Sequence, residues 1–357
     1  MGNPKTRFSV QYDINEKKSI RRKAEILELQ IKDKSEDNIN KIFPNQDECG
    51  KKICNAFQNR EIISCLVYGM TQTGKTGCMT ALILHYVLEN LIPINNIYII
   101  TGLSDIEWKR DTKNRMPESI NSRVFHRANL TKSFYNDVSQ KNKKNILIIM
   151  DEIQIACKEG QTIHTIFREY GLYDLDFLLE RDIKLVQFSA TPDGNINDIN
   201  DWRQHSTKVK LSPGYGYYGA KEALEQNRVK QYRDLKNINN VIELKNTIEN
   251  AFKSPRYHII RVPSKRVTVN GNNQEKVLSN LREAFGDQFV YNTDHLKIEK
   301  GYINDLLQEK PDKHTFVFIC EKGRCAKTYY KRYIGVSYER IRDDPDDSNI
   351  LQGSFGR

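Results

Sequence analysis

The chain has 357 residues, of which 38% are hydrophobic and 29% are charged, and its formal net charge is +10. No apolar run approaches the roughly 20 residues that span a bilayer, and the N-terminus lacks the apolar core of a secretory signal, so we expect neither a membrane protein nor a secreted one. The seven cysteines form no zinc-type CxxC pair, which favours free thiols in a reducing, intracellular compartment. The positive charge favours a polyanionic partner but does not by itself establish one.

The length predicts two domains, because it exceeds the size at which a single core usually keeps growing. Residues 1–40 are polar and include the basic cluster "KKSIRRK". We expect an N-terminal extension there, which either contacts nucleic-acid phosphates or forms a solvated helical face. In residues 41–212, helical stretches alternate with the apolar runs "IISCLVYG", "NIYIITG", "NILIIMDE" and "IKLVQFSAT". Continuous apolar runs are typical of parallel strands covered by helices on both faces.

A second strand and helix series follows in residues 256–357, with the apolar runs "RYHIIRVPS", "FVYNT", "HTFVFICE" and "YIGVSYER". Residues 213–255, rich in Asn, Gly and Tyr, are predicted to connect the two series. The chain stops at "ILQGSFGR", where a second parallel sheet would still need a closing strand, so we expect this domain to be truncated. The predicted fold class is α/β, with two mainly parallel sheets in tandem.

A phosphate-binding loop is predicted between the first apolar run and the helical stretch after it, where the sequence matches G-x-x-x-x-G-K-[ST]. The glycines let backbone N–H groups turn around the phosphates, and the helix start adds its dipole. Lys75 is expected to neutralise the β- and γ-phosphate oxygens, and the Thr76 hydroxyl to bind Mg²⁺. The alternative is a Gly/Thr-rich turn with a helix-capping lysine. The predicted nucleotide-binding residues of the loop are Gly69, Thr71, Gln72, Thr73, Gly74, Lys75 and Thr76.

An acidic pair is predicted at the carboxyl end of another buried strand, where open α/β sheets bind ligands. "NILIIMDE" places Asp151 there, so we expect it to hold Mg²⁺ together with Thr76. Glu152 is expected to orient or deprotonate the water that attacks the γ-phosphate. Such a pair is otherwise a turn or a helix cap, and the phosphate loop earlier in the chain favours the catalytic interpretation.

Two shorter segments are predicted to complete the nucleotide site. In "FSATP", the hydroxyls of Ser189 and Thr191 close an apolar strand, and we expect them to hydrogen-bond the acidic loop and relay the nucleotide state. In "FPNQDE", Gln46 precedes the phosphate loop, and its amide is expected to read the edge of an adenine. The sequence has no guanine-reading NKxD motif, so we expect ATP rather than GTP.

Polymer contacts and an arginine from the second domain are also predicted. The segment "IITGLSD" ends a strand with small polar residues whose N–H groups suit a nucleic-acid backbone, and "EKGRCAKT" offers cations. In "LQGSFGR", Arg357 is expected to complete the charge on the γ-phosphate in the transition state. The predicted nucleic-acid contacts are Thr101, Gly102, Ser104, Arg324 and Lys327. In the C-terminal segment, Gln352 is predicted to couple hydrolysis to movement, and Gly356 and Arg357 are predicted to lie at the nucleotide.

This set of motifs resembles the superfamily 2 helicases and translocases, which have two RecA-like domains, over most of residues 41–357. The segments "ITGLSDIEWKRDTKNRMP", "PGYGYYG" and "EKGRCAKT" resemble sequences of the DEAD-like helicases of large DNA viruses and some phages. The corresponding segments are Gly69–Thr76 for motif I, Thr101–Asp105 for motif Ia, Asp151–Gln154 for motif II, Ser189–Thr191 for motif III and Gln352–Arg357 for motif VI.

Two departures from that pattern concern coupling of hydrolysis to movement. Motif II reads "DEIQ", with Gln154 where the best-known members have Asp or His. Motif VI usually reads Q-x-x-G-R-x-x-R, whereas here the glutamine is one residue farther from Gly356 and the second arginine is missing, since the sequence ends at Arg357.

The resemblance implies an ATP-dependent helicase or translocase with ATP and Mg²⁺ as cofactors. Its partner would be nucleic acid, DNA more than RNA, together with proteins of a replication or transcription complex. If the chain is viral, its location would be the host cytoplasm or a viral factory. Two alternatives stay open: a duplex DNA translocase or motor subunit without unwinding, and an ATP-dependent nucleic-acid clamp with weak turnover.

Overall fold

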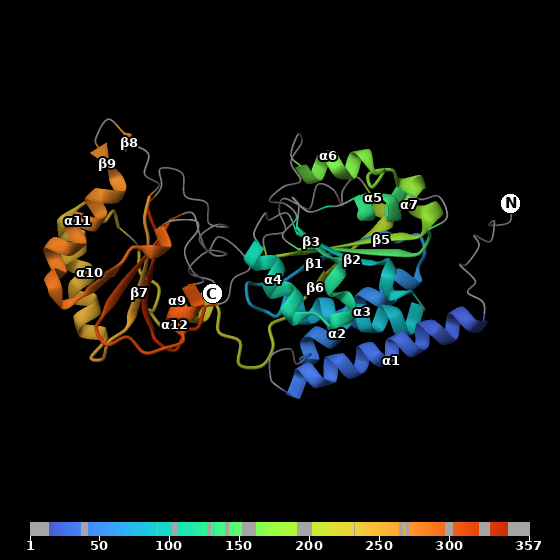
Figure 1. Ribbon diagram of the computed structural model, residues 1–357, viewed down its shortest axis with the longest axis horizontal. Helices are drawn as coiled ribbons and strands as arrows, with labels where there is room; N and C mark the ends of the chain where they lie inside the picture. Colours follow the sequence, from blue (N-terminus) through green and yellow to red (C-terminus); the bar gives the residue numbers. More distant parts are fainter. Residues whose placement is uncertain are drawn as a thin grey trace. The chain divides into compact units, whose positions relative to one another are not determined.

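In the computed structural model the chain forms two compact units, Met1–Tyr217 and Tyr218–Arg357. Each unit contains a parallel sheet with helices packed on it (Figure 1). This confirms the predicted α/β class with two mainly parallel sheets in tandem. The residues that the structure describes are 14–36, 42–90, 92–101, 106–126, 130, 132–139, 143–151, 162–190, 202–231, 233–263, 267–268, 271–296, 303–320 and 329–341.

The first unit is built around a six-stranded sheet with the strand order β3-β2-β4-β5-β1-β6, in which every neighbouring pair is parallel. Most of its strands are buried on both faces, as their continuous apolar runs predict. The strands are β1 (Ser64–Tyr68), β2 (Ile97–Thr101), β3 (Val124–His126), β4 (Ile146–Asp151), β5 (Ile183–Ser189) and β6 (Ser206–Lys210).

Helices cover both faces of this sheet (Figure 1). Alternate residues of one strand enter different cores: Ile97 and Ile99 pack with α1, α2 and α3, whereas Tyr98 and Ile100 pack with α5, α6 and α7. Among the described helices, none combines the length and apolar composition needed to cross a bilayer. The helices of this unit are α1 (Ile14–Glu36), α2 (Pro44–Gln58), α3 (Lys75–Asn90), α4 (Ile106–Arg115), α5 (Lys132–Ser139), α6 (Thr162–Glu169) and α7 (Leu175–Arg181), with the 3₁₀ turns η1 (Ile94–Asn96), η2 (Glu118–Arg123) and η6 (Arg203–His205).

Helix α1 lies within the predicted N-terminal extension, and one side of it packs into the core of the first unit. Ile20, Ala24, Leu27 and Ile31 recur at helical spacing and are buried in the same core as α2 and α3. The basic side chains of the "KKSIRRK" cluster are exposed on the other side of the helix. Residues 14–36 are mostly polar in composition. Four apolar residues in about three helical turns are nevertheless enough to form one buried stripe.

The second unit has a four-stranded parallel sheet with the order β10-β11-β7-β12. Helix α10 lies within the segment predicted to be a connector, yet its apolar side is buried in the core of this unit together with α11, β7 and β11. The strands are β7 (Tyr257–Arg261), β10 (Val290–Asn292), β11 (Thr315–Ile319) and β12 (Ile334–Tyr338), with a small antiparallel pair, β8 (Val267–Thr268) and β9 (Gly271–Asn272). The helices are α9 (Ala220–Glu225), α10 (Ile238–Ala251), α11 (Asn273–Phe285) and α12 (Ile303–Leu307), with the 3₁₀ turns η7 (Gly286–Gln288) and η8 (Asp294–Leu296).

Two contacting histidines of this second unit connect β7 with β12 and with the residue that precedes β11. The fully buried His258 of β7 accepts the N–H of Val336 at its Nδ1, at 3.3 Å, and its Nε2 lies 2.9 Å from Nδ1 of His314. Because Nδ1 is an acceptor, the proton of His258 lies on Nε2 and is donated to His314. Burial lowers the pKa of His258 to about 3 and also lowers the pKa of His314. Both rings are therefore neutral in the folded chain.

We expect the second unit to lose stability in mild acid. The pKa of His258 falls from an ordinary 6.5 to about 3 on folding, so the unfolded chain binds more protons between these values. The contribution is complete above about pH 6.5 and is lost as the pH falls toward 3. Hydrogen-exchange protection factors for β7 and β12 at pH 7.5 and pH 5 would measure the change. The variant His258→Leu cannot gain a proton at this position, so its pH dependence should be reduced to the smaller part that His314 contributes. Equal protection of the original chain at both pH values would contradict the account.

Candidate nucleotide-binding site

The carboxyl ends of four strands meet along one edge of the first sheet. The register pairs Thr101 with Asp151, Asp151 with Phe188, and Ser189 with Tyr68, the residue from which the glycine-rich loop departs. Strand β5 lies between β1 and β4, so Asp151 is two strands from the loop, on the order of 10 Å at ordinary strand spacing. Residues that are far apart in the sequence are thus brought to the edge where parallel sheets bind ligands.

The loop between β1 and α3 is anchored at both ends. The N–H of Gly69 donates to the carbonyl of Ser189 at 3.3 Å, and the hydroxyl of Thr73 donates to the carbonyl of Met70 at 2.9 Å. Gly74 has a φ of +86°, a left-handed conformation that favours glycine. Helix α3 begins immediately after it, at Lys75, so the first N–H groups of a 16-residue helix open onto the loop. This is the arrangement that binds phosphate groups.

Gln46 lies against this loop. It is 6% exposed, and its Oε1 accepts the N–H of Phe43 at 3.0 Å, which caps the start of α2. A Cβ added to Gly77 would lie 2.7 Å from Cδ of Gln46, and one added to Gly74 would overlap its amide nitrogen. The amide therefore braces the loop and the first turn of α3. That it also reads an adenine stays a prediction, whereas the role of Gly77 was missed, because no local motif signals a contact with α2.

The residues predicted to hold Mg²⁺ fit that ion by the chemistry of their donors. Asp151 ends β4 and is 7% exposed, and Thr76 lies half-buried in the first turn of α3. A carboxylate and a hydroxyl are hard oxygen ligands of the kind that Mg²⁺ takes together with substrate phosphates. The part of the site that the structure describes therefore offers both predicted ligand types.

Two predicted side chains lie deeper than expected. Thr101 is fully buried and lies between Asp151 and His126 in the sheet. Its contact with nucleic acid stays a prediction. Ser189 is also fully buried, and it reaches the phosphate loop through its main-chain carbonyl. The remaining predicted site residues lie outside the described residues, and their roles stay predictions: Gly102, Ser104, Glu152, Thr191, Arg324, Lys327, Gln352, Gly356 and Arg357.

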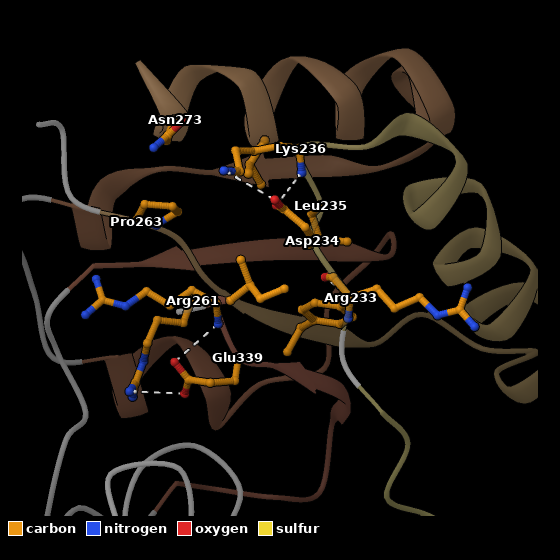
Figure 2. A pocket seen from close by; sticks show the side chains of 12 residues that line it. Arg233, Asp234, Leu235, Lys236, Arg261, Pro263, Asn273 and Glu339 are labelled. Atoms are coloured by element: carbon orange, nitrogen blue, oxygen red, sulfur yellow. Dashed lines mark hydrogen bonds and ion pairs between the residues drawn. The ribbon is translucent and has the colours of Figure 1, made fainter. Parts of the chain in front are cut away.

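A charged cavity lies at the carboxyl end of β7 in the second unit. It measures about 130 Å³, and Figure 2 shows Arg261 and Glu339 facing each other on one side and Asp234 and Lys236 on the other. Arg261 Nη1 lies 3.2 Å from Glu339 Oε2, and both side chains are buried. Removing one partner of such a pair leaves an uncompensated buried charge, which costs about 3–5 kcal/mol. Sequence reasoning missed this pair, for which the only signal is opposite charges at the ends of two strands.

Gly77→Ala is expected to destabilise the first unit, although alanine favours helix more than glycine by about 1 kcal/mol. The new Cβ would displace the Gln46 amide and break its cap on Phe43. Removing the amide relieves the overlap, so Gly77→Ala combined with Gln46→Ala should be more stable than the sum of the two single effects, by about 1 kcal/mol or more. Urea unfolding would measure the free energy of unfolding of the original chain, the two single variants and the double variant, which together form a double-mutant cycle. Strict additivity would show that the amide does not pack on Gly77.

No protein-family model matches the chain. It is 27% identical over 343 residues to the uncharacterized protein L594 of Acanthamoeba polyphaga mimivirus, covering 87% of this chain and 80% of that protein. Similar solved structures include the Escherichia coli DEAH/RHA helicase HrpB, at TM-score 0.46 and 16% identity over 77% of this chain and 34% of that one.

A second similar structure is the DEAD-box helicase Mss116 bound to ssRNA and UDP-BeF, at TM-score 0.41 and 16% identity, covering 86% of this chain and 60% of that one. This chain therefore spans 34% of one helicase and 60% of the other. The similarity in sequence is thus to a viral protein, and both of these structural similarities to helicases have TM-scores below 0.5.

Proposed function

We propose that the chain is a nucleic-acid-dependent ATPase that couples ATP hydrolysis to movement along DNA or RNA, or to strand separation. The observation that carries this proposal is the carboxyl edge of the first sheet. There, a loop with the phosphate-binding sequence opens onto the N-terminus of α3, and Asp151 ends a strand at the same edge. A phosphate cradle and a carboxylate on one edge are two of the parts that enzymes of phosphoryl transfer use.

The chain's own residues have separable tasks in this mechanism. The loop N–H groups and the Lys75 ammonium bind the triphosphate, and Gln46 keeps the loop and the helix start in place. Thr76 and Asp151 would hold Mg²⁺, which supplies charge neutralisation between the β- and γ-phosphates when it is bound. Glu152 directly follows Asp151 in the sequence, and we assign to it the task of orienting and deprotonating the attacking water.

Arg357 is proposed to supply positive charge to the γ-phosphate as it is transferred. Gly102, Ser104, Arg324 and Lys327 are proposed to hold the polymer by phosphate and sugar, since a motor must tolerate every sequence. The net charge of +10 supports a polyanionic track. ATP-driven rearrangement of the two units would then convert turnover into stepping.

We propose an intracellular, reducing location. Within the described part of the chain, five cysteines are free thiols: Cys49, Cys54, Cys65, Cys78 and Cys320. Such thiols persist where glutathione and thioredoxin keep them reduced.

Steady-state ATP hydrolysis should rise when one polymer is added, because a motor turns over productively only on its track. The assay compares no polymer, single-stranded DNA, duplex DNA and single-stranded RNA. Glu152→Gln should lower kcat by about 100-fold or more while nucleotide still binds, since it removes the general base. Lys52→Ala is the control, because that lysine is exposed on α2 and its ion pair, among the described residues, is with its equally exposed helix neighbour Glu48.

The outcomes separate the alternatives. Stimulation by duplex DNA without strand separation would identify a duplex translocase or motor subunit. ATP-dependent polymer binding with little turnover in every condition would identify a clamp. Absence of both hydrolysis and nucleotide binding in the unaltered chain would contradict the proposed function.

A further inference from the structure

The segment from Leu211 to Tyr217, here called the strap, runs out of the first unit alongside the phosphate loop. It follows β6, which pairs in parallel with β1, and the N–H of Leu211 continues that pairing by donating to the carbonyl of Tyr68 at 2.9 Å. A Cβ on Gly69 would lie 2.9 Å from the carbonyl oxygen of Leu211. The strap therefore begins in direct contact with the first residue of the loop.

The strap is also fixed to the start of α2. The side-chain amide of Asn45 donates to the carbonyl of Ser212 at 2.8 Å. A Cβ on Gly214 would lie 3.0 Å from Oδ1 of Asn45, so the strap passes close to that side chain. Asn45 immediately precedes Gln46, which braces the loop from the other side. The same turn of α2 thus contacts both the strap and the loop.

Tyr217 closes this arrangement. Its N–H donates to the carbonyl of Gly214 at 3.2 Å, and Gly216 adopts a left-handed φ of +74°, which turns the chain back on itself. The Tyr217 hydroxyl then donates to the carbonyl of Thr71 in the phosphate loop at 2.8 Å. A side chain from the end of the first unit thereby holds the main chain of the nucleotide site.

This hydrogen bond has a specific consequence for the loop. The peptide bond is planar and trans, so C=O and N–H point in opposite directions. Holding the oxygen of Thr71 on the side of Tyr217 fixes the direction of the N–H of Gln72, the residue with a left-handed φ of +60°. A phosphate loop binds through such N–H groups, and a carbonyl turned inward would repel the phosphates instead.

We propose that Tyr217 is a positioning residue for the phosphate loop and that it couples nucleotide binding to the chain leaving the first unit. The proposal rests on the proposed function of the loop. Tyr217 is the last residue of the first unit. Its hydrogen bond to the carbonyl of Thr71 therefore joins the phosphate loop to the point at which the chain leaves that unit. Because linkage is reciprocal, a strap that favours nucleotide binding is itself ordered by the nucleotide, by the same factor.

The test compares Tyr217→Phe, which removes only the hydroxyl, with Tyr215→Phe as a matched control. Tyr215 lies two residues earlier in the strap and its side chain is fully exposed. For the full chain, the Kd of a non-hydrolysable ATP analogue with Mg²⁺ should rise roughly threefold to tenfold in Tyr217→Phe, the factor that one hydrogen bond is worth. Tyr215→Phe should leave the Kd unchanged.

Hydrogen exchange of the strap distinguishes coupling from a purely structural role, because a structural role alone would not make the exchange rate depend on the nucleotide. The analogue should slow exchange in residues 211–217 of the unaltered chain and of Tyr215→Phe, and this effect should be lost or much reduced in Tyr217→Phe. The proposal would be overturned by an unchanged Kd in Tyr217→Phe, or by hydrogen exchange in the strap of the unaltered chain that is the same with and without the analogue. Either result would leave the proposed function intact. Failure of the unaltered chain to bind the analogue would instead refute the proposed function, and this inference with it.

Discussion

The parallel register of the first sheet is the constraint on which the candidate site depends. Parallel strands that are paired in register end at a common edge, and here that edge collects the phosphate loop, Ser189 and Asp151. None of these residues is near another in the sequence. A shift of one residue in β4 would turn the Asp151 side chain to the other face of the sheet. Two-sided burial in the apolar cores fixes this register, so stability and site geometry have the same physical origin.

The phosphate loop is held from three directions by separate parts of the first unit. Strand β5 holds its beginning through the carbonyl of Ser189, α2 holds its end through the amide of Gln46, and the strap holds its middle through Tyr217. A loop fixed in this way does not have to be ordered by the ligand, which lowers the entropic cost of binding. The second unit contains different buried polar interactions, the neutral pair of His258 and His314 and the ion pair of Arg261 with Glu339.

The sequence was sufficient to predict the elements with strong local signals. Continuous apolar runs predicted both parallel sheets, and the spacing of Gly69, Gly74 and Lys75 predicted a loop between a strand and a helix. Contacts between distant segments left no comparable signal. The packing of Gln46 on Gly77 and the bond from Tyr217 to Thr71 depend on where α2 and the strap come to lie. They became visible only in three dimensions.

The sequence does not predict the depth of a polar residue that ends a strand. Small polar residues follow Thr101, yet it is fully buried between β3 and β4. Charge dominates the composition of helix α1, so the sequence did not reveal that its apolar stripe is buried in the core.

The central claim is that the carboxyl edge of the first sheet binds a nucleoside triphosphate. The most direct measurement is a hydrogen-exchange footprint of a non-hydrolysable ATP analogue with Mg²⁺ on the full chain. The account predicts protection of residues 69–76 and of the end of β4 near Asp151, with no comparable effect at the amino ends of the same strands. Protection confined to other segments, or none at saturating analogue, would contradict it.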